Sequence, residues 1–130
     1  YGSFMYLYAR LASDYQVKVV PGVTSVTTCA ARAGMPLAAR NECLTVLPGP
    51  LPTEELRVRI EGAESVAIMK VGRHLSKIRA VIADLGLTDK AAYIERASLP
   101  DELVCPLAQA PETAPYFSMI ILTKGADPWL

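Results

Sequence analysis

The sequence predicts an α/β fold in which a mixed β-sheet carries flanking helices. Two observations support this class. Up to residue 85, segments with apolar residues at helical spacing alternate with short β-branched runs, an order that favours parallel strand pairing. Beyond that point, strand-like runs follow one another with no helix-length segment between them, which favours antiparallel additions to the same sheet. At 130 residues, the chain has the usual size of one domain.

The first part of the chain is predicted to hold two helices around a short strand. Residues 4–11 place apolar side chains three and four positions apart, which is typical of an amphipathic helix. Residues 17–20 form a β-branched run that predicts a strand. The second helix is expected to begin at Thr24 or Ser25, either of which can cap its free N–H groups. It should end at Gly34.

The middle of the chain predicts two more strands, each followed by a helix. Residues 43–47 and residues 66–69 are short apolar runs of strand length. Between them, Thr53 is expected to cap a short helix that Gly62 closes. Residues 75–85 place apolar side chains on one face of a further helix.

The last part of the chain predicts three strands. Residues 92–96, 103–107 and 117–122 have the length and apolar content of strands. Because Pro106 has no N–H to donate to a neighbouring strand, residues 103–107 are expected at the edge of the sheet. Residues 117–122 are continuously apolar and are expected near its centre.

Composition and charge exclude several classes of partner. Lysine plus arginine and aspartate plus glutamate each number 13, so no overall positive charge favours nucleic acid. Apolar runs are shorter than the ~20 residues that span a bilayer, so no membrane partner is expected. Cys29, Cys43 and Cys105 lie far apart and, with the single His74, make a poor zinc set, so no metal is expected. An odd number of cysteines suits buried thiols in a reducing compartment, and we expect a cytoplasmic protein.

The first candidate ligand site is the turn between the predicted strand 17–20 and the helix that follows it. A helix N-terminus at the carboxyl end of a strand exposes N–H groups where ligands commonly bind in α/β sheets. Thr24 and Ser25 add hydroxyl groups there. The alternative is a helix cap without a ligand, and the local pattern by itself favours that reading.

The second candidate site follows the predicted strand 66–69. The thioether of Met69 can pack on an apolar ligand ring, and Lys70 or Arg73 can hold a carboxylate. The alternative places Met69 in the core and both cations in solvent. His74 has no aspartate or serine partner close in sequence, so no nucleophilic triad is predicted.

Four segments together resemble the tetrapyrrole methylase family. Residues 19–25 read VVPGVTS, and AGMPL follows at residues 33–37, which is similar to the family's V-P-G-[IV]-[ST]-[AS] turn and the A-G-[IM]-P-L end of its helix. Residues 67–72 resemble the segment in which a methionine follows a hydrophobic strand. Residues 93–98 and 118–122 resemble the next strand and the last one. The resemblance covers almost the whole chain.

This resemblance implies an S-adenosyl-L-methionine-dependent methyltransferase acting on a small-molecule tetrapyrrole. It places Thr24 and Ser25 beside the cofactor, with Met69 and the backbone of Ala97 near the adenosine part. Lys70 is the candidate catalytic residue, on the substrate side. The run MKVGRHL from Met69 is most similar to the branch of the family that methylates precorrin-2 at carbon 20 in cobalamin biosynthesis. A homodimer is the family's usual assembly.

The resemblance also implies that this chain is the C-terminal part of a two-domain fold. The family's first domain, with its glycine-rich turn and G-D-P motif, is expected before Tyr1. Residues 1–21 would be the last helix and strand of that domain, and residues 22–130 the second domain. The chain by itself is therefore expected to lack turnover and tight cofactor binding. Alternatives are a sibling enzyme acting on another carbon or on cobalt-factor II, a relative modifying RNA or protein, and a non-catalytic ligand-binding or dimerisation module.

Overall fold

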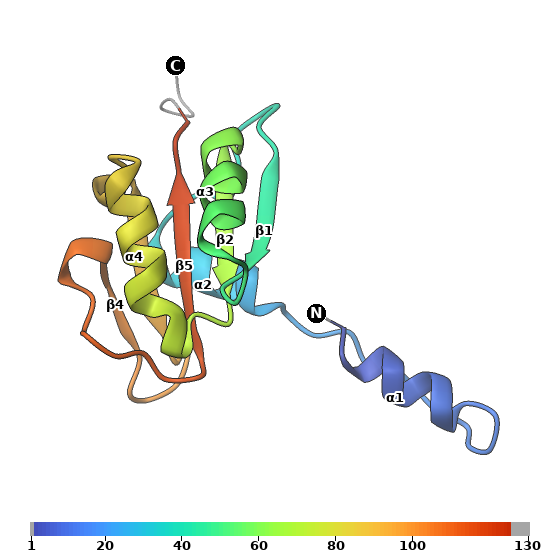
Figure 1. Cartoon of the computed structure of the whole chain (residues 1–130). Coiled ribbons are helices and arrows are strands. Elements are labelled where there is room, and N and C mark those ends of the chain that lie inside the picture. The colour runs from blue at the N-terminus through green and yellow to red at the C-terminus, as the bar shows by residue number, and fades with distance from the viewer. Residues whose placement is uncertain (1, 126–130) are drawn as a thin grey trace.

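The computed structural model describes residues 2–125 (Figure 1). Four α-helices and five strands, with three short 3-10 helices between them, make up its described part. In chain order they are α1 (Phe4–Leu11), α2 (Ser25–Ala33), β1 (Leu44–Pro48), α3 (Thr53–Gly62), β2 (Ser65–Met69), α4 (Leu75–Asp84), β3 (Ala91–Glu95), β4 (Leu103–Pro106) and β5 (Ser118–Thr123). Among the described helices, none has the length and apolar content needed to cross a membrane.

The five strands form one mixed sheet in the order β1-β2-β5-β3-β4. β1 and β2 pair in parallel, and β5 runs antiparallel to both β2 and β3. β4 pairs antiparallel with β3 at the edge of the sheet, where Pro106 lies opposite Ala92. These pairings confirm the predicted mixed sheet, the edge position of residues 103–107 and the central position of residues 117–122.

Helices cover both faces of the sheet (Figure 1). Side chains alternate along each strand, so successive residues pack on opposite faces. On one face, α3 and α4 bury fully enclosed aliphatic side chains such as Leu56 and Ile78 against Val66 and Ile68 of β2. On the other face, α2 packs Cys29 and neighbouring residues against a smaller cluster. The sheet thus has a larger core cluster on the face covered by α3 and α4 and a smaller one on the face covered by α2.

The structure confirms most of the predicted helix ends. Thr24 is the N-cap of α2, and its side-chain oxygen accepts the Thr27 N–H at 3.4 Å. Gly34 ends α2 in the left-handed conformation, with φ of 63°. The predicted cap at Thr53 is wrong, because Pro52 takes the cap position in an extended conformation and Thr53 becomes the first helical residue.

The predicted strand at residues 17–20 is also wrong. Within residues 2–125 this segment belongs to none of the strands, and Val20 is 79% exposed. A strand requires a neighbour for its N–H and C=O groups. Here the segment between α1 and α2 runs outside the sheet, back from α1, which projects from the body of the molecule (Figure 1). Tyr1, assigned with these residues to a preceding domain, lies outside the described residues.

A close backbone contact joins the ends of β1 and β2. The N–H of Gly49 donates to the carbonyl of Met69 at 2.7 Å. A β-carbon at position 49 would lie 2.7 Å from the carbonyl oxygen of Lys70 and 3.2 Å from the Cδ1 of Ile78. Position 49 therefore requires glycine, because a side chain would displace the backbone that follows β2.

Replacing Gly49 with alanine is expected to lower the free energy of unfolding by about 1–3 kcal/mol, since the added methyl group overlaps backbone atoms. Gly62→Ala is the matched control, because Gly62 has open space around its Cα at the end of α3. That control should raise stability by about 0.5–1 kcal/mol. Urea unfolding measures both, and equal effects of the two substitutions would contradict the close-contact argument.

Candidate functional site

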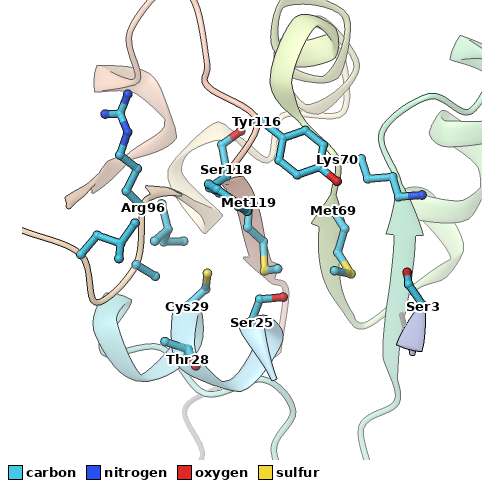
Figure 2. A pocket seen from close by; sticks show the side chains of 14 residues that line it. Ser3, Ser25, Thr28, Cys29, Met69, Lys70, Arg96, Tyr116, Ser118 and Met119 are labelled. Carbon is cyan, nitrogen blue, oxygen red and sulfur yellow. The ribbon is translucent and has the colours of Figure 1, made fainter. Parts of the chain in front are cut away.

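A pocket of about 680 Å³ lies where β2 and β3 end and β5 begins (Figure 2). β2 and β3 point the same way in the sheet because β5 is antiparallel to both. Their carboxyl ends therefore meet at one edge, where ligands bind in open α/β sheets. The amino-terminal half of α2 forms a further wall of the pocket.

The structure brings together four of the five site residues predicted from the sequence. Ser25, Met69, Lys70 and Ala97 all line the pocket. They come from α2, the end of β2 and the loop after β3, so the fold assembles them from three distant segments. Thr24 lies one residue before α2 and is engaged in capping it, with its carbonyl also accepting the Thr28 hydroxyl at 2.9 Å.

The side chain of Lys70 leaves the pocket. Lys70 has φ of 57°, a left-handed conformation that is uncommon for residues with a side chain. Figure 2 shows its ammonium group directed away from the space shared by Ser25, Met69 and Met119. Gly49 thus packs closely on the backbone of Lys70, whose charged group lies outside the central space of the pocket.

Sulfur atoms and hydroxyl groups face the centre of the pocket. Figure 2 shows the sulfurs of Cys29, Met69 and Met119 and the hydroxyl of Ser25 pointing into the same space. Such polarisable groups pack well against aromatic rings and other sulfur atoms. Cys29 was not predicted as a site residue, although it follows Ser25 by four positions and the helical repeat places it on the same face.

The mouth of the pocket carries an exposed aromatic pair. Tyr116 and Phe117 are 76% and 67% exposed, and their ring centroids lie 5.2 Å apart in an edge-to-face arrangement. The Ser118 hydroxyl holds this segment by donating to the Pro115 carbonyl at 2.7 Å and accepting the Gly72 N–H at 3.2 Å. The sequence did not predict Tyr116, Phe117 and Ser118 as site residues, because only the position of β5 between β2 and β3 brings them to the pocket.

A buried polar network fixes the end of β3. The Tyr93 hydroxyl donates to Oε2 of Glu95 at 2.6 Å, and Arg96 donates to Oε1 of the same carboxylate at 3.0 Å. Burial and the bond to Glu95 raise the pKa of the Tyr93 hydroxyl, so it stays protonated as a donor. Arg96 also pairs with Asp101 at 3.1 Å.

Among the described residues, no three potential metal ligands lie together.

The fold and the pocket define an α/β domain with a small-molecule-sized site at the carboxyl ends of parallel strands. The chain belongs to the Tetrapyrrole (Corrin/Porphyrin) Methylases, whose family model matches residues 1–111. It is 42% identical over 128 residues to the Precorrin-2 C(20)-methyltransferase of Sinorhizobium sp, covering 98% of this chain and 52% of the relative. It is 32% identical to the Cobalt-precorrin-2 C(20)-methyltransferase of Salmonella typhimurium, covering 95% and 54%.

Solved structures show the same fold at low sequence identity. A cobalt precorrin-4 methyltransferase, CbiF, superposes with a TM-score of 0.70 at 21% identity, covering 95% of this chain and 59% of the other. A uroporphyrin-III C-methyltransferase from Thermus thermophilus, complexed with S-adenyl homocysteine, superposes with a TM-score of 0.60 at 24% identity, covering 95% and 58%. The chain thus spans about half the length of the two methyltransferase relatives it matches in sequence.

The pH dependence of Cys29 alkylation tests whether the pocket wall is closed. Burial, reinforced by the charge of Glu102, raises the pKa of the Cys29 thiol to about 11. With Cys43 and Cys105 replaced by serine, the rate of reaction with iodoacetamide should rise about tenfold per pH unit through pH 10, because only the thiolate reacts. A rate that levels near pH 9 would mean an ordinary, exposed thiol.

Proposed function

We propose that this chain forms the cofactor-binding part of an S-adenosyl-L-methionine-dependent enzyme that methylates precorrin-2 at carbon 20. The observation that carries the proposal is the convergence of Ser25, Met69 and Ala97 on one pocket at the strand ends. The family resemblance assigns these three residues to the cofactor, together with Thr24, which caps α2 beside them. The names of the relatives at 42% and 32% identity support the substrate and the carbon.

The chemistry of the pocket fits the proposed cofactor. A volume of about 680 Å³ lies within the range typical of small-molecule sites. The adenine ring of adenosine needs a flat apolar surface with a few polar partners. Met69, Ile94 and Leu99 offer the apolar surface. The Ser25 hydroxyl and the backbone of Ala97 offer polar partners. A sulfonium requires no metal and no acid to activate it.

When bound, S-adenosyl-L-methionine supplies an electrophilic methyl group, which carbon 20 takes as the carbon–sulfur electron pair returns to sulfur and carbon 20 later loses its proton. The residues of this chain would contribute alignment and exclusion of water. The loop at Ala97 and the turn after Met69 would fix the adenosine end. Met119 and Cys29 would keep water from the reacting centre, since both present apolar sulfur to the pocket.

Lys70 remains our candidate on the substrate side. Its ammonium lies outside the central space, where it is available to a carboxylate of the tetrapyrrole entering from the pocket mouth. In this role Lys70 binds and orients the macrocycle, and the exposed rings of Tyr116 and Phe117 supply an apolar surface beside it.

The chain spans about half the length of these relatives, so the other half can supply the second wall of the cofactor site. We propose that residues 1–21 belong with a first domain and that residues 22–130 are the second, with the cofactor between them. The separation of α1 from the sheet and the exposure of its apolar side chains, such as Phe4 and Leu7, support this division (Figure 1). By itself the chain should then show neither turnover nor tight cofactor binding.

We further propose that the full-length protein is a cytoplasmic homodimer.

A closely related candidate function is methylation of the same carbon in a cobalt-loaded substrate. The observation that favours it is the 32% identity with the Salmonella typhimurium relative, whose name specifies cobalt-precorrin-2. Both functions use the same pocket and cofactor, so only the preferred substrate separates them.

A chimera tests the proposed reaction directly. This chain would replace the 128 matching residues of the Sinorhizobium sp relative. With precorrin-2 and S-adenosyl-L-methionine, we expect the chimera to transfer a methyl group, because this chain contributes a pocket equivalent to that of the segment it replaces. NMR of the product should locate the new methyl group at carbon 20.

The chimera has two controls and two informative failures. The 130-residue chain alone should give no product, and the relative lacking the matching segment should give none either. Methylation of cobalt-precorrin-2 in place of precorrin-2 would favour the second candidate. Cofactor binding with methylation at a different carbon would overturn the proposed regiochemistry.

Met69→Ala in the same chimera tests the proposed cofactor contact. Loss of the thioether surface should raise the KM for S-adenosyl-L-methionine about tenfold while kcat changes little, because the contact is made before and during methyl transfer alike. Val58→Ala is the control, since Val58 is 66% exposed on α3. An unchanged KM for the Met69 variant would remove Met69 from the proposed site.

A further inference from the structure

One carboxylate joins α2 to the loop that follows β3. Arg32 of α2 donates from Nε to both oxygens of Glu102 at 2.8 Å and from its Nη2 to Oε1 at 2.6 Å. Oε2 of Glu102 also accepts the backbone N–H of Ser98 at 2.6 Å. Glu102 therefore connects a helix and a loop that are 70 residues apart in sequence.

The two connected segments are walls of the pocket. α2 contributes Ser25 and Cys29, and the loop contributes Ala97 and Leu99. The loop holds an uncommon backbone conformation, since Ser98 has φ of 67°. Such a conformation persists only where surrounding contacts enforce it. The Ser98 N–H bond to Glu102 supplies one of those contacts next to Ala97.

We propose that Glu102, held by Arg32, is a positioning residue that keeps the loop 96–99 closed against α2 and so sets the backbone of Ala97 for cofactor binding. The proposal rests on the proposed function of the pocket. Glu102 is not among the residues that line the pocket, and it acts through Ser98 and Arg32.

A second arginine–carboxylate pair shows what a merely stabilising contact looks like in this chain. Arg59 donates to Glu55 from Nε and from its Nη2 at 2.9 and 2.6 Å, within α3. The side chains of Arg32 and Arg59 are almost equally exposed, at 54% and 53%, whereas Glu102 is more buried than Glu55, at 14% against 40%. Pairs with an exposed arginine contribute little to overall stability. Arg59→Ala is therefore a control that removes an arginine of equal exposure from a carboxylate away from the pocket.

The position of the loop can be measured through Cys29, without any ligand. Cys29 is 5% exposed and packs in a cluster that includes Ala97. In the chain with Cys43→Ser and Cys105→Ser, the rate of alkylation by iodoacetamide at one fixed pH reports how often the loop opens. The variants to compare are Arg32→Ala, Glu102→Gln, Glu102→Ala and the Arg59→Ala control.

A positioning role predicts a specific order of rates. Arg32→Ala and Glu102→Gln should each accelerate alkylation about fivefold, the effect of losing one exposed ion pair from the closed state. Glu102→Ala should accelerate it about tenfold or more, because the Ser98 N–H also loses its acceptor. Arg59→Ala should leave the rate unchanged, while the thermal midpoints of Arg32→Ala and Arg59→Ala should fall by similar amounts.

A purely electrostatic effect on the thiol gives a different order. Removing the Glu102 charge would increase the thiolate fraction of Cys29, so Glu102→Gln and Glu102→Ala would accelerate equally. Removing the Arg32 charge would then slow the reaction or leave it unchanged. That order, or equal rates in all variants, would overturn the proposal.

A second readout tests the link to the cofactor. In the chimera with the Sinorhizobium sp relative, Arg32→Ala and Glu102→Ala should raise the KM for S-adenosyl-L-methionine about fivefold or more, with Arg59→Ala as the control. A faster alkylation with an unchanged KM would overturn the role in cofactor binding. If the unsubstituted chimera transfers no methyl group, the proposed function fails, and the alkylation rates alone still decide whether Glu102 holds the loop.

Discussion

The insertion of β5 between β2 and β3 is the constraint on which the rest of the structure depends. Because β5 pairs antiparallel with both neighbours, β2 and β3 keep the same direction without touching each other. Their carboxyl ends are separated by the width of one strand, and the start of β5 lies between them. Ser118 and Met119 at the start of β5 therefore line the pocket together with the ends of β2 and β3.

The two faces of the sheet carry core clusters of different size. On the face covered by α3 and α4, the central strands present large side chains such as Ile68, Ile120 and Leu122, all fully buried. On the opposite face the central strands present a smaller cluster that mixes alanines, such as Ala67, with larger side chains such as Ile121. The short helix α2 lies on that smaller surface, and its amino-terminal half stands at the strand ends. Close packing on one face thus coexists with an open site on the other.

The turns at the strand ends are held in uncommon conformations by specific contacts. Lys70 and Arg96, which follow β2 and β3 directly, both have positive φ. The backbone after β2 is constrained by the close approach of Gly49, and Arg96 is held by Glu95 and Asp101. Unfavourable backbone conformations are concentrated at functional sites because they set the exact direction of neighbouring groups. In this chain, Lys70 and Arg96 themselves line the pocket.

The sequence by itself predicted most elements of the fold and the mixture of parallel and antiparallel strands, through local rules: apolar spacing, helix caps, glycine at a helix end and proline at a sheet edge. The four predicted residues that line the pocket followed from the family resemblance and not from these local rules. Local rules could not show that residues 17–20 lack a neighbouring strand or that Pro52 caps α3. They also could not show that Cys29, Tyr116 and Ser118 line the pocket. The tertiary structure decided these, since a strand needs a neighbour and a pocket needs segments that meet only when β5 inserts. Hydrogen bonding and packing between residues far apart in sequence are the physical reason.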